Sequence, residues 1–361
     1  ETIMYYMYAL WIRSHNDLPL LINQWNNVVR FDTKVTRPFI RGREFLWQEG
    51  HTAHATQEDA RKWVDIFVGL YAKVYESLGM EALILVRPKS DTFPGADFSV
   101  VFDTVMKDGR VIQGPDCHML GQHFSKPFNI TFVDEHQEKK HVWQLSWGMT
   151  TRQIGAVIMH HGDDRGAFLP PAIAPHQVVV VPILFKDSEA KVMKQSQIVA
   201  DELKKQGIRV YLDKRNYTAG YKFNEWELKG VPLRIEVGPK DVETKHVTCV
   251  GRDGQKTQLV VTSLHRVRTM LDELQNDMLK RSKAFLKKST ADVTTLADLK
   301  NIFGFARANW CNAGACEADI KARSGGYEIR GTLFGKEEKP FANCIGCGKK
   351  AASVVYVAKA Y

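Results

Sequence analysis

Apolar residues recur at helical spacing in the segment that follows Thr56. Thr56 and Asp59 are three residues apart, as in the start of a capping box. The apolar positions after them are separated by three or four residues, which predicts one amphipathic helix that ends before Gly79, a residue suited to the C′ position. We interpret this stripe as core packing and not as a cofactor site. It consists of Ala60, Trp63, Phe67, Leu70, Tyr71, Val74 and Leu78.

Strand-like segments surround this helix. The stretch 37–51, RPFIRGREFLWQEGH, is interpreted as a strand that returns antiparallel to 24–32 after a turn. Because side chains alternate between the two faces of a strand, one face would mix cations, aromatic rings and a carboxylate. That face would carry Arg41, Arg43, Phe45, Trp47 and Glu49. Further strands are expected within 18–31, 98–105 and 128–134.

The pattern changes after 169–175, LPPAIAP, which is interpreted as a proline-rich linker. The next run, HQVVVVPILF (176–185), is continuously apolar, as in a buried strand. The strands and helices that follow alternate, which predicts a small α/β domain with a mixed sheet at 176–275. We expect a helix over 188–205, a strand over 208–213, a helix over 223–229, a strand over 233–238, a hairpin around 251–254 and a long basic helix over 263–288.

Composition and charge narrow the class of protein. The 361 residues are 44% hydrophobic and 25% charged, as in folded globular domains, and their number allows two or three domains. No apolar run approaches the roughly 18 residues that a membrane helix needs, and the first residues lack the basic n-region of a signal peptide. We therefore expect a cytoplasmic protein. The net charge of +9 is compatible with a polyanionic partner, although many basic proteins bind no nucleic acid.

Four of the six cysteines cluster near the C-terminus. Cys311 and Cys316 have the spacing C-x4-C, and Cys344 and Cys347 have the spacing C-x2-C. Without a sign of secretion, such pairs favour a metal site over disulfides. Four thiolates would complete a tetrahedral structural zinc site, and reduced free thiols are the alternative.

The hairpin over 24–51 carries residues that suit a nucleotide. Arg30 precedes the turn, and a guanidinium group there could pair with phosphate through two hydrogen bonds. Arg41, beyond the turn, could bind a second phosphate, and Phe45 offers a flat ring on which a base can stack. The alternative is a surface hairpin with arginine–glutamate pairs, which would contribute little stability.

Several segments together resemble prolyl-tRNA synthetases of the eukaryotic and archaeal type, which are class II aminoacyl-tRNA synthetases. RFD (30–32) followed by RPFIRGREFLWQEGHTAHAT (37–56) is similar to the second class II motif, and WQLSWGMTTRQIG (143–155) is similar to the third. The resemblance extends over essentially the whole chain. It includes ETIMY at the start, IQGPDCHMLGQHFSKPF (112–128), GYKFNEWELKGVPLRIEVGPKD (220–241) and the final Ala-Tyr. The resemblance suggests that Tyr361 turns its carboxylate toward the catalytic domain.

The resemblance implies an α/β (α+β) protein with three domains. These would be a class II catalytic domain on an antiparallel sheet at 1–175, an anticodon-binding domain with a mixed sheet at 176–275, and a small α+β domain of the zinc type at 276–361. The family's first motif, which builds the dimer interface, would precede Glu1, and a chain that began there would expose part of its catalytic sheet and would not be expected to act alone.

The implied activity is that of a proline--tRNA ligase. Such an enzyme uses ATP with Mg²⁺ to convert L-proline to prolyl-adenylate and transfers the prolyl group to tRNA(Pro), as a homodimer. Two alternatives stay open: a synthetase that uses both proline and cysteine, and a synthetase-like tRNA-binding protein without catalysis.

By resemblance, Arg30 and Arg152 would be the catalytic arginines. Arg30 would hold the α-phosphate and the amino acid carboxylate, and Arg152 would face the γ-phosphate and the adenine ring. ATP and the adenylate would be bound by Arg30, Arg41, Phe45, Gln113, Thr150 and Arg152. The proline pocket would be formed by Glu1, Trp47, Glu49, His118, Trp147 and Gly148. For Trp147, packing in the core is the alternative.

The resemblance also implies which residues bind the anticodon. The two guanines of the proline anticodon would be read by Glu227, Arg234, Lys240 and Asp241, since acids accept hydrogen bonds from guanine amino groups and cations meet O6 or N7.

One segment departs from the family pattern. It is Gly114-Pro115-Asp116-Cys117-His118, which stands where the family usually has Gly-Thr-Ser-His. It leaves open how this chain discriminates proline from cysteine.

Overall fold

The computed structural model describes residues 1–361 and divides them into two compact units. Unit 1 consists of residues 1–74, 81–156 and 285–361, and unit 2 consists of residues 75–80 and 157–284. The domain boundaries expected after 175 and after 275 stay predictions. No helix in the chain combines the length and the apolarity needed to cross a bilayer.

Unit 1 is built on one ten-stranded sheet with the order β1-β2-β8-β5-β4-β3-β16-β17-β15-β14. Neighbouring strands from β1 to β15 are antiparallel, and β14 joins β15 in parallel. This large antiparallel sheet confirms the catalytic fold class expected from the sequence. The strands are β1 Leu20–Val29, β2 Glu44–His54, β3 Leu83–Val86, β4 Phe98–Val105, β5 Val111–Gly121, β8 Trp143–Thr150, β14 Thr290–Asp292, β15 Phe305–Trp310, β16 Glu328–Leu333 and β17 Ser353–Ala358, with β6 Thr131–Val133 and β7 Lys139–His141 as a separate hairpin.

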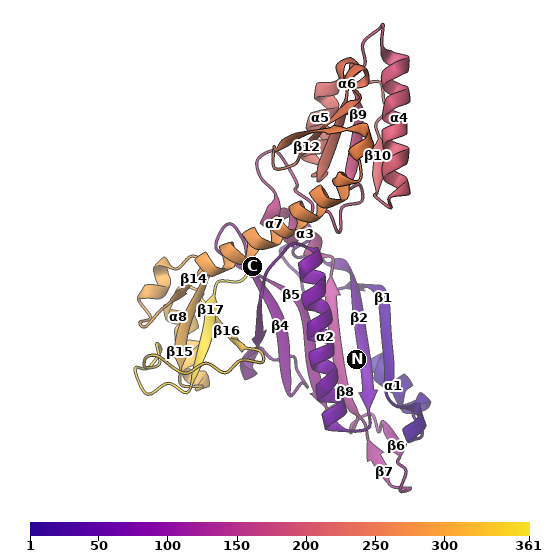
Figure 1. Cartoon of the computed structure of the whole chain (residues 1–361). Helices are drawn as coiled ribbons and strands as arrows, with labels where there is room; N and C mark the ends of the chain where they lie inside the picture. Colours follow the sequence, from indigo (N-terminus) through magenta and orange to yellow (C-terminus); the bar gives the residue numbers. More distant parts are fainter. The chain divides into compact units, whose positions relative to one another are not determined.

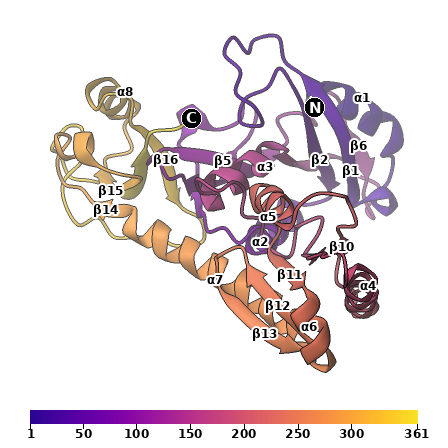
Figure 2. The ribbon, with the colours of Figure 1, turned by 90° about the horizontal axis from the view of Figure 1, so that it is seen from above.

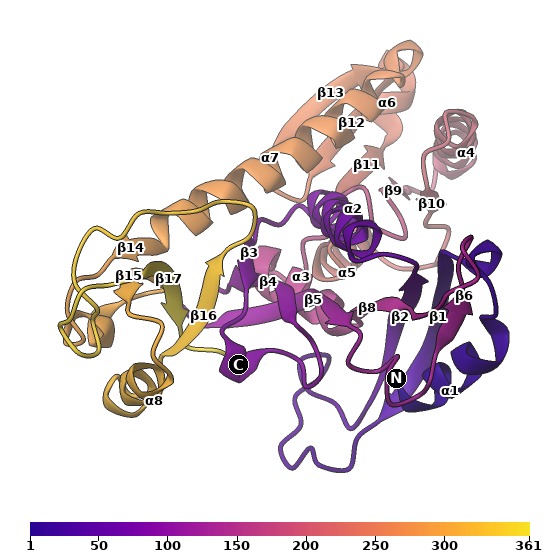
Figure 3. The ribbon, with the colours of Figure 1, turned by 90° about the horizontal axis from the view of Figure 1, so that it is seen from below.

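The long helix expected after Thr56 is α2 (Gln57–Ser77), and it runs along one face of the sheet of unit 1 (Figure 1). The Thr56 hydroxyl accepts a hydrogen bond from the backbone N–H of Asp59 at 3.1 Å, as the sequence predicted. Phe67 of α2 stacks on Trp147 of β8 with 3.7 Å between ring centroids. The loop 30–43 and the C-terminus lie on the opposite face of the sheet (Figures 2 and 3). The other helices that begin in this unit are α1 Thr2–Trp11, α3 Arg152–His161 and α8 Gly314–Arg323.

The strand predicted over 37–51 begins only at Glu44, so its first part was wrong. Arg37 and Arg41 exchange two backbone hydrogen bonds, of 2.9 and 3.0 Å, which close a tight turn around Phe39, whose φ is 59°. Because this turn satisfies its own backbone groups, it does not pair with β1. Arg41 therefore reaches its neighbours from a loop and not from the strand face that carries Phe45.

Unit 2 contains a five-stranded sheet with the order β10-β9-β11-β12-β13. Strands β10, β9 and β11 are parallel and β12 and β13 are antiparallel to their neighbours, which confirms the predicted mixed sheet. One face packs on α4 and α7 through residues such as Val199 and Leu271, and the other packs on α5 through Trp226. The elements are β9 Val178–Pro182, β10 Val210–Leu212, β11 Leu233–Val237, β12 His246–Gly251, β13 Lys256–Val260, α4 Glu189–Lys205, α5 Ala219–Leu228, α6 Pro239–Thr244 and α7 Arg266–Lys288.

Candidate active site

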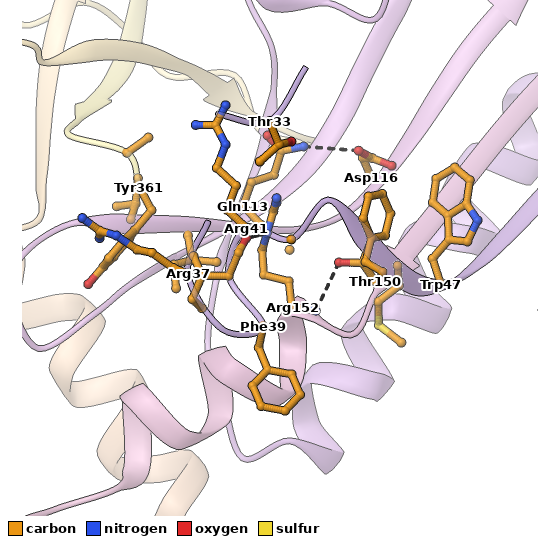
Figure 4. Close-up of a pocket in the computed structure, with 18 of the residues that line it drawn as sticks. Thr33, Arg37, Phe39, Arg41, Trp47, Gln113, Asp116, Thr150, Arg152 and Tyr361 are labelled. Carbon is orange, nitrogen blue, oxygen red and sulfur yellow. Dashed lines mark hydrogen bonds between the residues drawn. The ribbon is translucent and has the colours of Figure 1, made fainter. Parts of the chain in front are cut away.

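A cavity of about 590 Å³ lies in unit 1 between strands β2, β5 and β8, the loop 30–43, strand β16 and the C-terminal residues (Figure 4). Every residue that the sequence assigned to the nucleotide lines it: Arg30, Arg41, Phe45, Gln113, Thr150 and Arg152. These residues come from four separate segments of the chain. The sheet and the loop therefore bring together what the sequence predicted as one nucleotide site.

Strand register explains which side chains reach the cavity. Trp47 pairs with Thr150, and Glu49 pairs with Gly148, which in turn pairs with Asp116 of β5. Directly paired residues in antiparallel strands project from the same face of a sheet. These five residues therefore share the face that carries the cavity, opposite helix α2.

The aromatic and cationic groups of the cavity contact one another. The Arg30 guanidinium lies 5.3 Å from the centre of the Phe45 ring, and Phe45 meets Trp47 edge to face at 5.9 Å. The backbone N–H of Arg30 donates to the carbonyl of Arg43 at 2.6 Å, where the loop leaves β1 and returns to β2. A cation and a flat ring are thus placed side by side at the base of the loop.

Arg152 connects the loop to the floor of the cavity. Its Nε donates to the carbonyl of Ile40 at 2.9 Å, and its Nη1 donates to the carbonyl of Gln113 at 3.3 Å. The Thr150 hydroxyl accepts from the backbone N–H of Arg152 at 3.2 Å, where α3 begins (Figure 4). Arg152 is therefore held in a defined orientation at the start of a helix, where the helix dipole also favours a bound anion.

A line of polar side chains continues from the cavity along β5. Gln113 Nε2 donates to Asp116 at 3.2 Å (Figure 4), and Asp116 lies 3.5 Å from His118 Nε2. His118 Nδ1 is 2.7 Å from the Ser99 hydroxyl, and its ring stacks on Phe93 at 4.7 Å. Burial alone would lower the pKa of His118, but the Asp116 carboxylate, with Glu1 and Glu49 nearby, raises it above its ordinary value.

Carboxylates gather next to this line. The ligand atoms of Glu1, Glu49 and His51 all lie within 4.8 Å of one another. Glu49 accepts a hydrogen bond from Gln24 at 2.6 Å and lies 3.2 Å from His51 Nε2. Burial would raise the pKa of Glu49, but its hydrogen bonds with His51 and Gln24 bring the pKa below its ordinary value. An ionised, partly buried carboxylate is what a cationic amine requires as a partner.

The structure does not bring every predicted proline-binding residue to the cavity wall. Trp47 and Gly148 line it, whereas Glu1, Glu49 and His118 lie beyond it, along the same face of the sheet. Trp147 pairs with Gly50 and projects to the other face, where its ring is packed against Phe67. The structure therefore places Trp147 in the core, which was the alternative considered for it.

Comparisons with known proteins match the chain along nearly its whole length. Residues 1–161 match the tRNA synthetase class II core domain (G, H, P, S and T), residues 177–274 match an anticodon binding domain, and residues 296–361 match the C-terminal domain of prolyl-tRNA synthetase. A proline--tRNA ligase of Symbiobacterium thermophilum is 42% identical over all of this chain and 76% of its own length. A chloroplastic/mitochondrial proline--tRNA ligase of Arabidopsis thaliana is 40% identical over all of this chain and 68% of its own length.

A solved structure agrees with these relatives. Prolyl-tRNA synthetase from Cryptosporidium parvum, crystallised with L-proline and AMP, superposes with a TM-score of 0.94 at 40% identity, over all of this chain and 77% of that one. The chain belongs to the prolyl-tRNA synthetase family. The expectations of a class II synthetase fold and of a proline--tRNA ligase are thereby confirmed.

Two residues of the C-terminal part also line the cavity of unit 1. The family resemblance had suggested that Tyr361 turns toward the catalytic domain, whereas Arg330 was missed by sequence reasoning. Tyr361 lines the cavity, with its hydroxyl 2.6 Å from Asp108 and with the guanidinium groups of Arg37 and Arg110 over its ring at 5.9 and 5.6 Å. Arg330 of β16 also lines the cavity. The spacing of these residues carries no signal, because β16 and Tyr361 lie far along the chain from the loop 30–43. Only the pairing of distant strands brings them to the cavity.

Unit 2 has a cavity of its own, of about 190 Å³. Glu227 and Arg234, two of the four predicted readers, line it. Asp241 and Lys240 do not line it. The Asp241 carboxylate accepts from the backbone N–H of Gly238 at 2.8 Å and caps α6, and Lys240 is the second residue of that helix. The sequence missed the cations Arg165, Arg252 and Lys256, which line the same cavity.

The four late cysteines converge in the C-terminal part of unit 1. The sulfur atoms of Cys311, Cys316, Cys344 and Cys347 all lie within 4.8 Å of one another, and Cys311 Sγ is 3.8 Å from Cys347 Sγ. Four thiolates around a tetrahedral zinc ion at about 2.3 Å would be about 3.8 Å apart. The donor set and its spacing therefore fit a structural zinc ion.

Proposed function

We propose that the chain acts as a prolyl-tRNA synthetase in which the cavity of unit 1 activates L-proline with ATP. The observation that carries this proposal is the convergence of all six predicted nucleotide residues on one cavity, next to a group of partly buried carboxylates. Such an arrangement suits a ligand that is anionic and aromatic at one end and cationic at the other.

Arginines supply most of the charge that the nucleotide needs. Arg30 would hold the α-phosphate, Arg41 the outer phosphates, and Arg152 would face the γ-phosphate from the start of α3. Phe45 would stack on adenine once its contact with Arg30 opens, and Gln113 and Thr150 would donate hydrogen bonds. ATP would enter as its Mg²⁺ complex, and the acidic residues Asp32 and Glu328 are among those that line the same cavity.

The reaction itself needs little covalent chemistry from the protein. A carboxylate oxygen of proline attacks the α-phosphorus of ATP, the bond to the β-phosphate oxygen breaks, and pyrophosphate leaves. Fixed cations stabilise the charge that develops on the α-phosphate oxygens, and the cavity holds the reacting groups together. In the second step a terminal ribose hydroxyl of tRNA attacks the carbonyl carbon and AMP leaves, with the adenylate phosphate as the acceptor of the proton.

Proline would lie along the same face of the sheet, beyond the nucleotide. Trp47 and Gly148 would form the wall for the pyrrolidine ring, and Phe93 with His118 would close the far side. Glu1 and Glu49 would accept hydrogen bonds from the secondary ammonium group, since Glu49 is ionised at neutral pH. His118 would be oriented by Asp116 and Ser99.

The further partners are proposals of the same kind. tRNA(Pro) would present its anticodon to the cavity lined by Glu227 and Arg234, where an acid and cations can read guanine edges. The four cysteines would hold zinc in a structural role, because four thiolates leave no position for a substrate.

A homodimer is supported by large exposed apolar side chains on α1 and β1, such as Ile3 and Trp25. A cytoplasmic location stays a prediction.

Proline-dependent exchange between pyrophosphate and ATP tests the proposal. The wild-type chain should catalyse it, and Arg30→Ala should lower the rate by about 100-fold or more because the α-phosphate loses its cation, while binding of tRNA stays nearly unchanged. Arg61→Ala is the matched control: Arg61 lies on α2, over Phe98 at 4.5 Å, away from the cavity, and its loss should leave exchange unchanged. Equal losses in the two variants, or equal loss of exchange and tRNA binding in Arg30→Ala, would contradict the assignment.

A further inference from the structure

A buried ionic cluster borders the cavity of unit 1, and one of its members, Arg330, also lines the cavity. Arg87 follows β3, Asp103 lies on β4, and Arg330 lies on β16, in the C-terminal part of the chain. Asp103 is completely buried, and the two arginines are each 5% exposed. Buried charges of this kind are costly unless they are paired and hydrogen-bonded. The hydrogen bonds of these three side chains therefore fix their orientations.

Asp103 is bound by both arginines through paired hydrogen bonds. Arg87 donates to its two carboxylate oxygens at 2.9 and 3.0 Å. Arg330 donates to the same two oxygens at 2.7 and 3.3 Å. Burial would raise the pKa of Asp103, but the two guanidinium groups keep it below its ordinary value, so Asp103 is ionised. One carboxylate therefore fixes two guanidinium planes.

Arg87 connects the buried cluster to Gln113, which lines the cavity. Its Nη1 also donates to the carbonyl of Arg330 at 2.6 Å, its Nε lies 3.2 Å from Asp91, and its Nη2 donates to Gln113 Oε1 at 3.0 Å. A guanidinium group cannot accept a hydrogen bond, so the Gln113 atom that faces it must be the amide oxygen. The amide nitrogen of Gln113 is then turned toward Asp116 and the cavity, as a donor.

The backbone of β16 is shaped for this contact. Thr332 pairs with Val86, the residue before Arg87. Gly331 has φ 136°, and a Cβ at this position would lie 2.1 Å from the carbonyl oxygen of Val86. Only glycine allows β16 to approach β3 this closely, and that approach brings Arg330 to Asp103.

From these contacts we infer that Arg330 and Asp103 are positioning residues of the nucleotide site, which act on ATP binding by fixing Arg87 and, through it, the amide of Gln113. The inference rests on the proposed function of the cavity as the ATP site. By this inference the C-terminal part of the chain contributes to nucleotide binding through β16, which lies outside the second and third class II motifs.

The test is ATP binding by calorimetry without proline, together with the KM for ATP in proline-dependent exchange. Arg330→Gln should raise the dissociation constant and the KM for ATP roughly tenfold, as expected for lost charge-assisted hydrogen bonds, and should leave kcat and the KM for proline within about twofold. Arg330→Lys keeps the buried charge but loses the paired geometry, and it should raise the same constants by roughly threefold. It is also the variant to use if Arg330→Gln does not fold.

Two controls separate positioning from general stability and from direct contact. Arg307→Gln removes another ion-paired arginine of the C-terminal part, bound to Asp292 at 2.8 Å and to Glu338 at 3.0 Å, and it should leave ATP binding unchanged. In a Gln113→Ala background, Arg330→Gln should add less than about twofold, because the group that it positions is already gone.

Three results would overturn the inference: unchanged ATP binding in folded Arg330→Gln, an equal effect of Arg307→Gln, or full additivity with Gln113→Ala, which would mean that Arg330 touches the nucleotide itself. Wild-type protein that binds ATP but shows no proline-dependent exchange would contradict the proposed function, while calorimetry would still decide the role of Arg330.

Discussion

At the scale of single residues, Asp116 is the side chain through which the segment 114–118, which departs from the family pattern, changes the cavity. Asp116 pairs with Gly148 and faces the cavity, whereas Cys117 pairs with Trp147 and is buried on the opposite face. Burial raises the pKa of the Cys117 thiol, so it stays a neutral packing group. The change that bears on substrates is therefore an added carboxylate between Gln113 and His118.

The pair of His118 and Asp116 predicts a pH dependence of stability. Since the folded state raises the pKa of His118 above its ordinary value of about 6.5, its contribution to the free energy of unfolding is fully present below about pH 6.5 and is lost as the pH rises through the folded pKa. The difference in melting temperature between the wild type and His118→Gln should then be larger at pH 5.5 than at pH 8.5. Thermal unfolding at the two pH values measures it.

Asp116→Asn supplies the control for this prediction. In that background the melting-temperature difference between His118 and its glutamine variant should lose most of its pH dependence, because the Asp116 carboxylate is the main group that raises the pKa of His118, and Glu1 and Glu49 contribute less. A difference that is the same at both pH values in the wild-type background would contradict the account.

At this scale the predicted nucleotide residues come together at one cavity because β2, β8 and β5 are adjacent strands, with Phe45 on β2, Thr150 on β8 and Gln113 on β5. Their roles stay predictions. The sequence did not place Trp147. Neighbours within a motif project to opposite faces of a strand, so Gly148 reaches the cavity while Trp147 packs on Phe67. Arg330 could not be found either, since its role depends on the pairing of β16 with β3.

At the scale of elements, strong hydrophobic periodicity predicted which helices and strands exist, and local turns determined where they begin and end. Helix α2 was predicted closely because its apolar stripe is regular and Thr56 caps it. The strand over 37–51 was overextended because the turn between Arg37 and Arg41 leaves no pattern in hydrophobicity. Helix α5 begins at Ala219, four residues before the expected start, because Thr218 accepts from the N–H of Tyr221 at 3.3 Å.

The packing of α2 on the sheet predicts a contrast between two glycines. A Cβ on Gly50 of β2 would lie 1.9 Å from the ring of Trp147, which is held against Phe67 and cannot withdraw. Gly50→Ala should therefore lower the free energy of unfolding by about 1–3 kcal/mol. Gly69 of α2 has no atom within 4 Å of such a Cβ, and Gly69→Ala should raise it by about 0.5–1 kcal/mol. Urea unfolding compares them, and equal midpoints for the two variants would show that the packing is wrong.

The cysteine cluster predicts a bound metal in the C-terminal part. Purified protein should contain about one zinc ion per chain, and Cys344→Ser should lose it together with part of the thermal stability. Cys249→Ser, a buried cysteine that stands alone in unit 2, should keep the zinc. Metal analysis with titration of accessible thiols checks this. Four thiols that react in the native protein, with no zinc present, would favour reduced free cysteines.

At the scale of the whole molecule, the predicted antiparallel and mixed sheets are confirmed, but the strand pairing that joins the catalytic and C-terminal parts was not foreseen. Strands β14 to β17 extend the catalytic sheet through β16 and β3, and Tyr361 ends in the cavity. Pairing between strands more than 200 residues apart leaves no signal in a single sequence. The C-terminal part therefore lines the cavity of unit 1 and also carries the four clustered cysteines.

Exchange of labelled pyrophosphate into ATP, measured separately with each of the twenty amino acids, tests the central claim most directly. Exchange is expected with proline. Glu1 and Glu49 should pair with its secondary ammonium group and Trp47 should pack on its ring, which favours proline over other small amino acids. Exchange with cysteine at the background level of a reaction without amino acid would exclude dual specificity. No exchange above that background with proline would contradict the account.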